Sequence, residues 1–290
     1  MATEEPMITF KREYTPSVEE KHRIRDGLLA VIDSKQEAGS QKEQRIQSYF
    51  EANTELFSVH NTYKNFFHQN MVLSKCPIGS LKTDYAYLSK KSDGWRVVFG
   101  EFELPEDKFF KVGSLDYTAK FNHALQQMQQ WQIYVKENKG EILRFFELLY
   151  QPINMRDNPT EFAFELIYGR SEDKNKTRER KLNIAATAKS MNIDIMSYDT
   201  AINNMMERQS LNRKNVISYN GSVIRYKRLN VFPEWDFSVY NSEQINLTSE
   251  QRSFLIQSGV DIESWEQGST LSQGGRKTRP LADLLGRFSA

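Results

Sequence analysis

The chain has 290 residues and a mass of 33.9 kDa, a length that corresponds to about two domains. Its 39 Lys and Arg residues balance 38 Asp and Glu residues, and the net charge of +1 excludes a histone-like protein that binds nucleic acid through overall charge. The single cysteine, Cys76, excludes an intrachain disulfide framework and a cysteine-rich zinc site. Without a predicted signal peptide or a long apolar stretch, we expect a soluble, cytoplasmic protein that does not cross a membrane.

The first elements that the sequence predicts are a short strand and two helices. Apolar and polar residues alternate over 7–15, which predicts the strand. Ser17 with Glu20 three residues later forms a capping box, which predicts that a helix begins there. A second helix is expected to begin at Ser40. It carries Glu43 on roughly the same face as its apolar residues, an unusual place for a carboxylate.

From about residue 58 the pattern becomes that of a sheet. Strands are expected over 71–76, 82–89 and 95–104, and the turn Ser92-Asp93-Gly94 makes the last two a hairpin. The elements expected next are a long helix (115–138), a shorter helix (141–149), a buried strand (162–168), a polar helix (173–190) and a short strand (193–197). Helix, three strands, helix and strand predict a mixed α/β core.

The character of the sequence changes after about residue 210. Short strands over 216–226 and 231–239 and a capped helix over 248–258 are expected there. The predicted division of the chain is an N-terminal strand–helix extension (1–38), a core domain (39–205) and a C-terminal region of unknown role (206–290).

The most informative segment is the strand that ends with Glu101 and Glu103. Side chains alternate across a strand, so these two carboxylates share one face, and both faces of the strand begin apolar, as in a strand buried on two sides. Antiparallel pairing can bring Asp84 opposite Glu101. Buried like charges are unfavourable unless they are compensated, and a divalent cation compensates carboxylates well. The sequence leaves two interpretations open, a metal site and a solvent-exposed strand end with Lys82 or Lys108 as a salt-bridge partner.

A longer pattern extends over about residues 43 to 200. Its parts, in order, are Glu43 with Phe50 and Asn53-Thr-Glu-Leu-Phe57, then Gly79-x4-Asp84-Tyr, Glu101-x-Glu103-x-Pro105, Ala124-x2-Gln127-x3-Trp131, Ile167-Tyr-Gly169-Arg170 and Tyr198-Asp199. Each motif alone is weak, whereas their order and spacing are specific. Together they resemble the nuclease domain of the Shedu anti-phage defence proteins, a branch of the PD-(D/E)xK nuclease superfamily.

The resemblance implies a restriction-endonuclease-like αβββαβ core with N-terminal and C-terminal additions. Such a core binds Mg²⁺ or Mn²⁺ and hydrolyses DNA, and the family implies a homo-oligomer, a dimer or a tetramer. By position, Asp84 and Glu101 would be metal ligands, with the carbonyl of Phe102 as a further ligand. Glu43 would be the outer acid that orients a metal-bound water. Gln127 would contact that site or the scissile phosphate.

The pattern departs from the family at Glu103, where the family motif Glu-x-Lys has its lysine. Some restriction endonucleases of the superfamily use Glu-x-Glu, with the second Glu as general base or anchor of a metal-bound water. Lys82 is a candidate to replace the lysine or contact DNA, and Arg170, Arg178 and Arg180 are candidates to hold backbone phosphates.

The function expected from the resemblance is a metal-dependent DNA endonuclease in bacterial anti-phage defence. A catalytically inactive DNA-binding or regulatory module on the same fold is the alternative, because a protein that only binds DNA would lose the lysine in the same way. A Holliday-junction or repair nuclease is a third interpretation.

Overall fold

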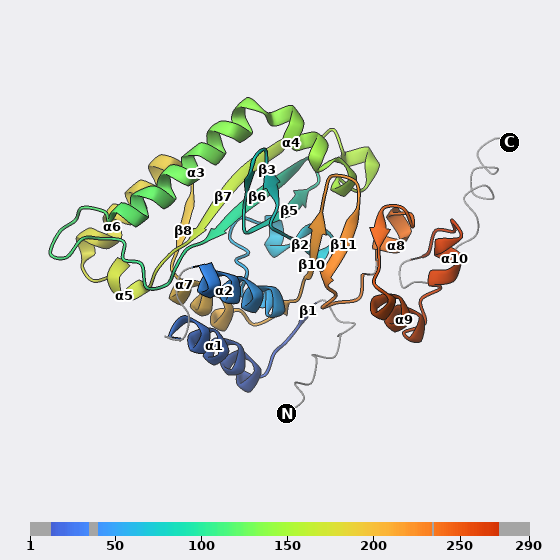
Figure 1. Cartoon of the computed structure of the whole chain (residues 1–290), viewed down its shortest axis with the longest axis horizontal. Coiled ribbons are helices and arrows are strands. Elements are labelled where there is room, and N and C mark those ends of the chain that lie inside the picture. Colours follow the sequence, from blue (N-terminus) through green and yellow to red (C-terminus); the bar gives the residue numbers. More distant parts are fainter. Residues whose placement is uncertain (1–12, 35–39, 234, 273–290) are drawn as a thin grey trace.

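An eight-stranded mixed sheet runs through the centre of the molecule (Figure 1). This arrangement comes from a computed structural model, which describes residues 13–34, 40–233 and 235–272. Along the sheet the strand order is β12-β11-β10-β2-β5-β6-β7-β8. In chain order these strands are β2 (Met71–Ser74), β5 (Tyr85–Lys91), β6 (Gly94–Phe102), β7 (Thr160–Ile167), β8 (Asp194–Met196), β10 (Asn215–Tyr219), β11 (Ile224–Arg228) and β12 (Ile245–Asn246). β5 and β6 are antiparallel, whereas β7 and β8 continue the sheet in parallel with β6. The predicted mixed α/β class is confirmed.

Helices cover both faces of the sheet (Figure 1). One face carries α1 (Val18–Ile32), α2 (Ser40–Ala52) and α7 (Tyr198–Glu207), and the other carries α3 (Ala119–Glu137), α4 (Lys139–Phe145) and α6 (Arg178–Met191). Val97 and Phe99 of β6 belong to the hydrophobic cluster on the α3 side, and Val98 and Phe102 belong to the cluster on the α2 side. All four side chains are at most 3% exposed. β6 is therefore buried on two sides, as its sequence predicts.

The smaller elements lie around this sheet. Two short pairs stand apart from it, β1 (Glu13–Tyr14) with β9 (Leu211–Asn212) and β3 (Pro77–Ile78) with β4 (Leu81–Lys82). The remaining helices are α5 (Ser171–Lys174), α8 (Asp236–Val239), α9 (Ser249–Gln257) and α10 (Ile262–Glu266). Single 3-10 turns are η1 (Thr54–Leu56), η2 (Tyr63–Asn65), η3 (His68–Asn70), η4 (Glu147–Leu149) and η5 (Ile153–Met155). Within the described ranges, no helix combines the length and the apolar character needed to cross a membrane.

Local signals in the sequence place several element boundaries correctly. The hydroxyl of Ser17 accepts a hydrogen bond of 3.1 Å from the N–H of Glu20, and α1 begins directly after Ser17. Thr248 caps α9 in the same way, within a complete capping box. Lys91 pairs with Gly94 across a two-residue loop, so the predicted hairpin is confirmed.

Other expected elements differ from the structure. The strand expected over 82–89 is interrupted after Lys82. The N–H of Thr83 donates a hydrogen bond to the carbonyl of Cys76, and Asp84 therefore lies between β4 and β5. The polar helix expected over 173–190 is two helices, because the hydroxyl of Thr177 caps a new start at α6.

Two further expectations change near the ends of the chain. The strand expected over 231–239 is wrong, since Pro233 has no N–H for a ladder and its carbonyl instead accepts from the N–H of Asp236, at the start of α8. Of the strand expected over 7–15, residues 7–12 lie outside the described residues, and β1 is the part that the structure describes.

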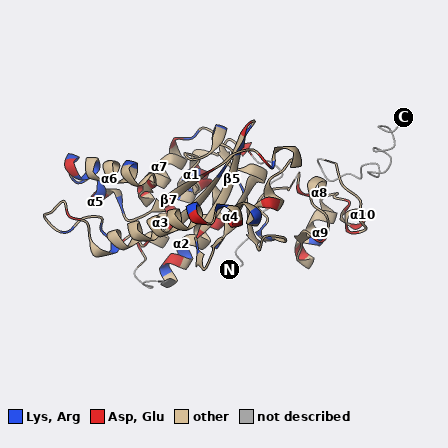
Figure 2. Ribbon diagram, turned by 90° about the horizontal axis from the view of Figure 1, so that it is seen from above, with Lys and Arg blue, Asp and Glu red and all other residues tan. Residues whose placement is uncertain are grey.

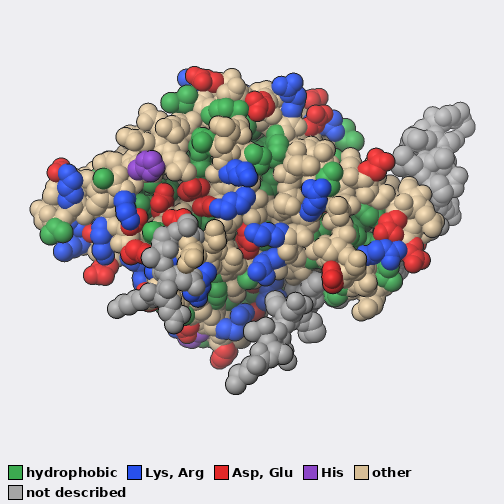
Figure 3. Space-filling view, viewed as in Figure 1, with side chains coloured by type: hydrophobic (Ala, Val, Ile, Leu, Met, Phe, Trp, Pro, Cys, Tyr) green, Lys and Arg blue, Asp and Glu red, His purple; other side chains and the backbone are tan. Residues whose placement is uncertain are grey.

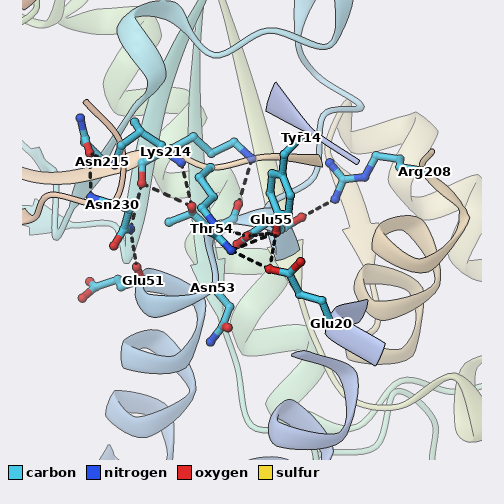
Figure 4. Close-up of polar contacts among 12 residues, drawn as sticks. Tyr14, Glu20, Glu51, Asn53, Thr54, Glu55, Arg208, Lys214, Asn215 and Asn230 are labelled. Atoms are coloured by element: carbon cyan, nitrogen blue, oxygen red, sulfur yellow. Dashed lines mark hydrogen bonds and ion pairs between the residues drawn. The ribbon is translucent and has the colours of Figure 1, made fainter. Parts of the chain in front are cut away.

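The C-terminal segment completes the central sheet. β10 pairs in parallel with β2, with Asn215 opposite Met71, so the sheet continues past residue 205. Thr54 holds this segment in place, because its hydroxyl accepts from the N–H of Lys214 at 2.8 Å and its carbonyl accepts from the Lys214 ammonium at 2.9 Å (Figure 4). Glu55 beside it accepts from the side chains of Tyr14 and Arg213. Two residues of the Asn53–Phe57 motif therefore anchor the chain that follows α7.

Candidate functional site

The structure brings Asp84 and Glu101 together at one end of β5 and β6. Tyr85 pairs with Gly100 in the hairpin, which places the two acids across from each other. The N–H of Asp84 donates to Oε2 of Glu101 at 3.2 Å, and the N–H of Phe102 donates to Oδ2 of Asp84 at 2.8 Å. The backbone of the hairpin itself therefore fixes both carboxylates.

Gln127 contacts Glu101 from the helical layer that contains α3. Its side-chain amide donates to Oε1 of Glu101 at 2.8 Å. Burial, followed by the negative charge of Asp84, raises the pKa of Glu101 to about 9, although both hydrogen bonds act in the other direction. Burial and the charge of Asp84 therefore favour the protonated form of Glu101, whereas its two hydrogen bonds favour the ionised form.

Glu103 and Glu43 approach the same place from two elements. Glu103 follows β6, where its N–H donates to the carbonyl of Ile167 at 2.9 Å and its carbonyl accepts from the hydroxyl of Tyr198 at 2.6 Å. Burial, followed by the charge of Glu43, raises the pKa of Glu103 to about 7. Burial and then the charge of Asp84 raise the pKa of Glu43, which lies on α2. The charge of Asp84 thus contributes to the raised pKa of each of the other three acids.

Lys75 is a basic residue of this site that the sequence analysis missed. Its N–H donates to the carbonyl of Asp84 at 2.9 Å, and its ammonium forms an ion pair with Oδ1 of the same residue. Lys82 lies instead on β4, in a separate small sheet, with an exposed side chain. The lysine beside the acids is therefore Lys75, because the chain turns between β4 and β5. Its position depends on the pairing of β2 with β5, for which the sequence carries no local signal.

The surface around these acids is mixed in charge. In the space-filling view, acidic side chains gather between α2 and α3, with Lys and Arg side chains beside them (Figure 3). Along the rest of the molecule, basic and acidic residues are interspersed on the helices (Figure 2). The local grouping of acids is therefore a feature of this site and not of a generally acidic face.

A buried polar network connects Asp84 with α2 and β11. The side-chain amide of Gln47 on α2 donates to the carbonyl of Asp84 at 3.1 Å and to Ser74 at 3.3 Å. Ser74 donates to Glu51 at 2.7 Å, and Glu51 forms an ion pair of 2.7 Å with Lys227 of β11. The antiparallel pair of β10 and β11 is thus connected to the backbone of Asp84 through α2.

The three arginines predicted to bind phosphates differ in their surroundings. Arg170 donates to both carboxylate oxygens of Asp199 and forms a further ion pair of 3.0 Å with Asp33. Arg180 is 6% exposed and pairs with Asp173 at 2.6 Å, so its guanidinium is held in a buried ion pair. Arg178 is exposed in the first turn of α6. A role in DNA binding stays a prediction for all three, and Arg178 is the one whose side chain faces solvent.

The number and chemistry of these acids decide which kind of metal ion they suit. No group of three or more His, Cys, Asp or Glu side chains in the described ranges is arranged to hold a metal ion. Mg²⁺, however, commonly binds one or two carboxylates and keeps several waters. Asp84 and Glu101 offer hard oxygen donors, and the two groups that donate to Glu101 are neutral, whereas Oδ1 of Asp84 is paired with the Lys75 ammonium. The pair therefore fits an otherwise hydrated cation that takes the place of Lys75 at Asp84, and the Phe102 carbonyl stays a predicted ligand.

The fold and the site define a mixed α/β protein with a buried acidic centre at the end of a central hairpin. The family described as Shedu protein SduA, C-terminal, has a model that matches residues 40–202, more than half of the chain. The chain belongs to this family, and membership implies a role in anti-phage defence. A comparison with curated proteins found no match.

Proposed function

We propose that this chain is a metal-dependent DNA endonuclease of the PD-(D/E)xK type, active as a homo-oligomer against phage or other foreign DNA. The observation that carries the proposal is the buried pair of Asp84 and Glu101, in which the pKa of Glu101 is raised to about 9 by burial and by Asp84. Buried acids with strongly shifted pKa values are typical of functional sites. The chain order α2, β2, β5, β6, α3, β7 also follows the expected sequence of helix, three strands, helix and strand.

Each residue of the site has a part in this proposal. Asp84 and Glu101 would hold a Mg²⁺ or Mn²⁺ ion, which when bound lowers the pKa of a coordinated water and neutralises charge on the phosphate. Glu103 is suited to accept a proton near neutral pH, because burial raises its pKa to about 7. Lys75 would stabilise negative charge on the phosphate, the part played by the family's lysine. Glu43 would orient the attacking water.

The test is cleavage of supercoiled and linear DNA by the 290-residue chain in Mg²⁺, in Mn²⁺ and in EDTA. We expect metal-dependent cutting that falls about 100-fold or more in Glu101→Gln, which keeps the side chain's size but removes its charge. Asp116→Asn changes an exposed carboxylate on the loop before α3 and should cut normally. Cutting in EDTA, or undiminished cutting by Glu101→Gln, would contradict the proposal.

A catalytically inactive DNA-binding or regulatory module is the second candidate. It is favoured by the ammonium of Lys75, which neutralises Asp84 without a metal, and by Glu103 at the lysine position. Calorimetric titration of the protein with Mn²⁺ separates the two. Retained DNA binding without metal binding or cutting would support the inactive module.

A further inference from the structure

The strands β10, β11 and β12 bury one face and expose the other. Ile217, Ile224 and Tyr226 belong to the hydrophobic cluster on the α3 side and are at most 4% exposed. On the opposite face, Ser218 of β10 pairs with Arg225 of β11, and both side chains are exposed. An antiparallel sheet that packs on one face only is polar on the other. Polarity is therefore expected on this exposed face, whereas the sign of its charges is not.

All charged side chains of these three strands are basic. They are Arg225, Lys227 and Arg228. Arg228 pairs with Val216, and the register shift next to this pair leaves Lys227 as an extra residue of β11, whose ammonium reaches Ser74 at 3.2 Å. Since Lys227 also neutralises a buried carboxylate on α2, the net positive charge of the exposed face comes from Arg225 and Arg228.

Acidic side chains lie at the outer edge of this face. Glu243, on the turn before β12, lines a cavity of about 330 Å³ together with Arg225, Arg252 and Glu266. Arg252 pairs with Glu266 at 2.9 Å. The basic face therefore ends at β12 on one side, and on its other side it approaches the candidate site.

The basic face and the acidic centre belong to one surface. Ser74 of β2 pairs with Tyr85, the residue after Asp84. β2 is also parallel to β10, so the end of β10 and the start of β11 lie at the same end of the sheet as Asp84. Neighbouring strands are about 4.8 Å apart, which puts β11, the third strand from β5, about 15 Å from it. In the space-filling view, Lys and Arg side chains extend from the group of acids over β10 and β11 (Figure 3).

These dimensions suit a DNA duplex. Each base pair adds about 3.4 Å along the helix axis, so about 15 Å corresponds to about four base pairs. A duplex with its scissile phosphate at Asp84 and Glu101 can therefore place backbone phosphates over β11. A guanidinium holds a phosphate through two parallel hydrogen bonds, and such contacts position DNA without reading its sequence.

We propose that the exposed face of β10 and β11, with Arg225 and Arg228, is a platform that holds the backbone of duplex DNA beside the acidic centre. The inference rests on the proposed function, from which it takes the DNA. It gives the segment beyond the matched family region a part in positioning DNA and none in the chemical step.

The first experiment measures binding of a labelled duplex of about 30 base pairs to the 290-residue chain, by fluorescence anisotropy in EDTA at several salt concentrations. Arg225→Gln should raise the Kd about fivefold or more and lower the slope of log Kd against log salt by about 0.9. Two duplexes of unrelated sequence should show the same loss. Lys189→Gln is the matched control, because it removes an exposed positive charge in the last turn of α6, before β8 and at the end of the sheet away from the acids.

A second pair of variants adds charge to the same face. Ser218→Lys places a cation beside Arg225 and should lower the Kd about threefold or more. Ser190→Lys adds the same charge at an exposed position of α6 and should leave the Kd unchanged. Because Ser218 is exposed, its variant tests the platform even if Arg225→Gln does not fold.

The inference is overturned if Arg225→Gln binds DNA as tightly as Lys189→Gln, or if Ser218→Lys binds it no more tightly than Ser190→Lys. Cleavage by the wild type in Mg²⁺ separates this result from a failure of the proposed function. Cutting together with unchanged binding in the variants would remove the platform alone. Weaker binding by Arg225→Gln without any cutting by the wild type would keep the platform and remove the nuclease. A wild type that binds no duplex at about 10 μM protein would overturn both.

Discussion

Glu101 and Glu165 are neighbours in the sheet, yet their surroundings differ. Glu165 of β7 pairs with Gly100 in register and lies on the opposite face from Glu101, where it accepts from the hydroxyls of Tyr85 and Tyr87, both at 2.7 Å, and from Asn61 at 2.9 Å. Burial, followed by the charge of Asp194, raises its pKa to about 7. Glu101 also has a carboxylate beside it, that of Asp84, but it accepts from two donors where Glu165 accepts from three, and its pKa rises to about 9. The acid with fewer donors is the one at the proposed metal site.

The protonation of Glu165 should make stability depend on pH. Its folded pKa of about 7 lies above the ordinary value of 4.5, so its contribution is fully present below pH 4.5 and is lost as pH rises through about 7. Glu165→Gln keeps a neutral side chain at every pH. Between pH 5 and 8.5, the free energy of urea unfolding should therefore fall by about 1–3 kcal/mol more in the wild type than in Glu165→Gln. Equal slopes in the two proteins would contradict this assignment.

At the scale of elements, α6 carries one arginine, Arg180, that is buried and another, Arg178, that is exposed. Asp173 of α5 accepts from the N–H groups of Phe109 and Phe110 and pairs with Arg180 of α6. This arrangement ties the loop before α3 to the two helices. Arg178, two residues earlier on α6, remains exposed.

The two arginines should therefore respond differently to mutation. Arg180→Met leaves the buried carboxylate of Asp173 without its cation and should lower the free energy of unfolding by about 3 kcal/mol. Arg178→Met should leave stability unchanged and weaken DNA binding, with a smaller dependence of log Kd on log salt. Urea unfolding and fluorescence anisotropy at two salt concentrations measure both effects. If Arg178→Met lost as much stability as Arg180→Met, the assignment of a structural role to Arg180 alone would be wrong.

The sequence was informative at this scale wherever the signal is local. Ser17, the turn before Gly94 and Thr248 each set a boundary through contacts within a few residues, and β6 showed its burial in its own alternation. The pairing that brings Lys75 to Asp84 joins two strands across a turn, so its residues carry no such signal. α7 was also missed, because its cap Ser197 lies at the end of an expected strand.

For the whole molecule, the main difference from expectation is that the C-terminal segment belongs to the sheet. The matched family region ends at residue 202, yet β10 covers the edge of β2, and Val216 and Ile217 are fully buried there. Such long-range pairing follows from the complete fold and cannot be seen in either segment alone. The polar network from Lys227 to Gln47 adds a connection to the candidate site.

A chain that ends at residue 207 should consequently fail to fold stably. It would expose the edge of β2 and leave Thr54 and Glu51 without Lys214 and Lys227. A chain that ends at residue 272 keeps these contacts and serves as the control. Circular dichroism melting and size-exclusion chromatography distinguish them. A cooperative melt of the shorter chain within about 5 °C of the control would show that the core is independent of β10 and β11.

The parallel pairing of β10 with β2 also has a consequence for the newly made protein. A ribosome adds about 5–20 residues each second, so on the order of ten seconds pass between the synthesis of Met71 and that of its partner Asn215. During that interval β2 can pair with β5 on one side, while its other edge has no strand of its own chain to meet. An unpaired edge of this kind joins readily with the same edge of a neighbouring nascent chain. Until β10 has been made, neighbouring chains on one polysome can therefore associate through the open edge of β2.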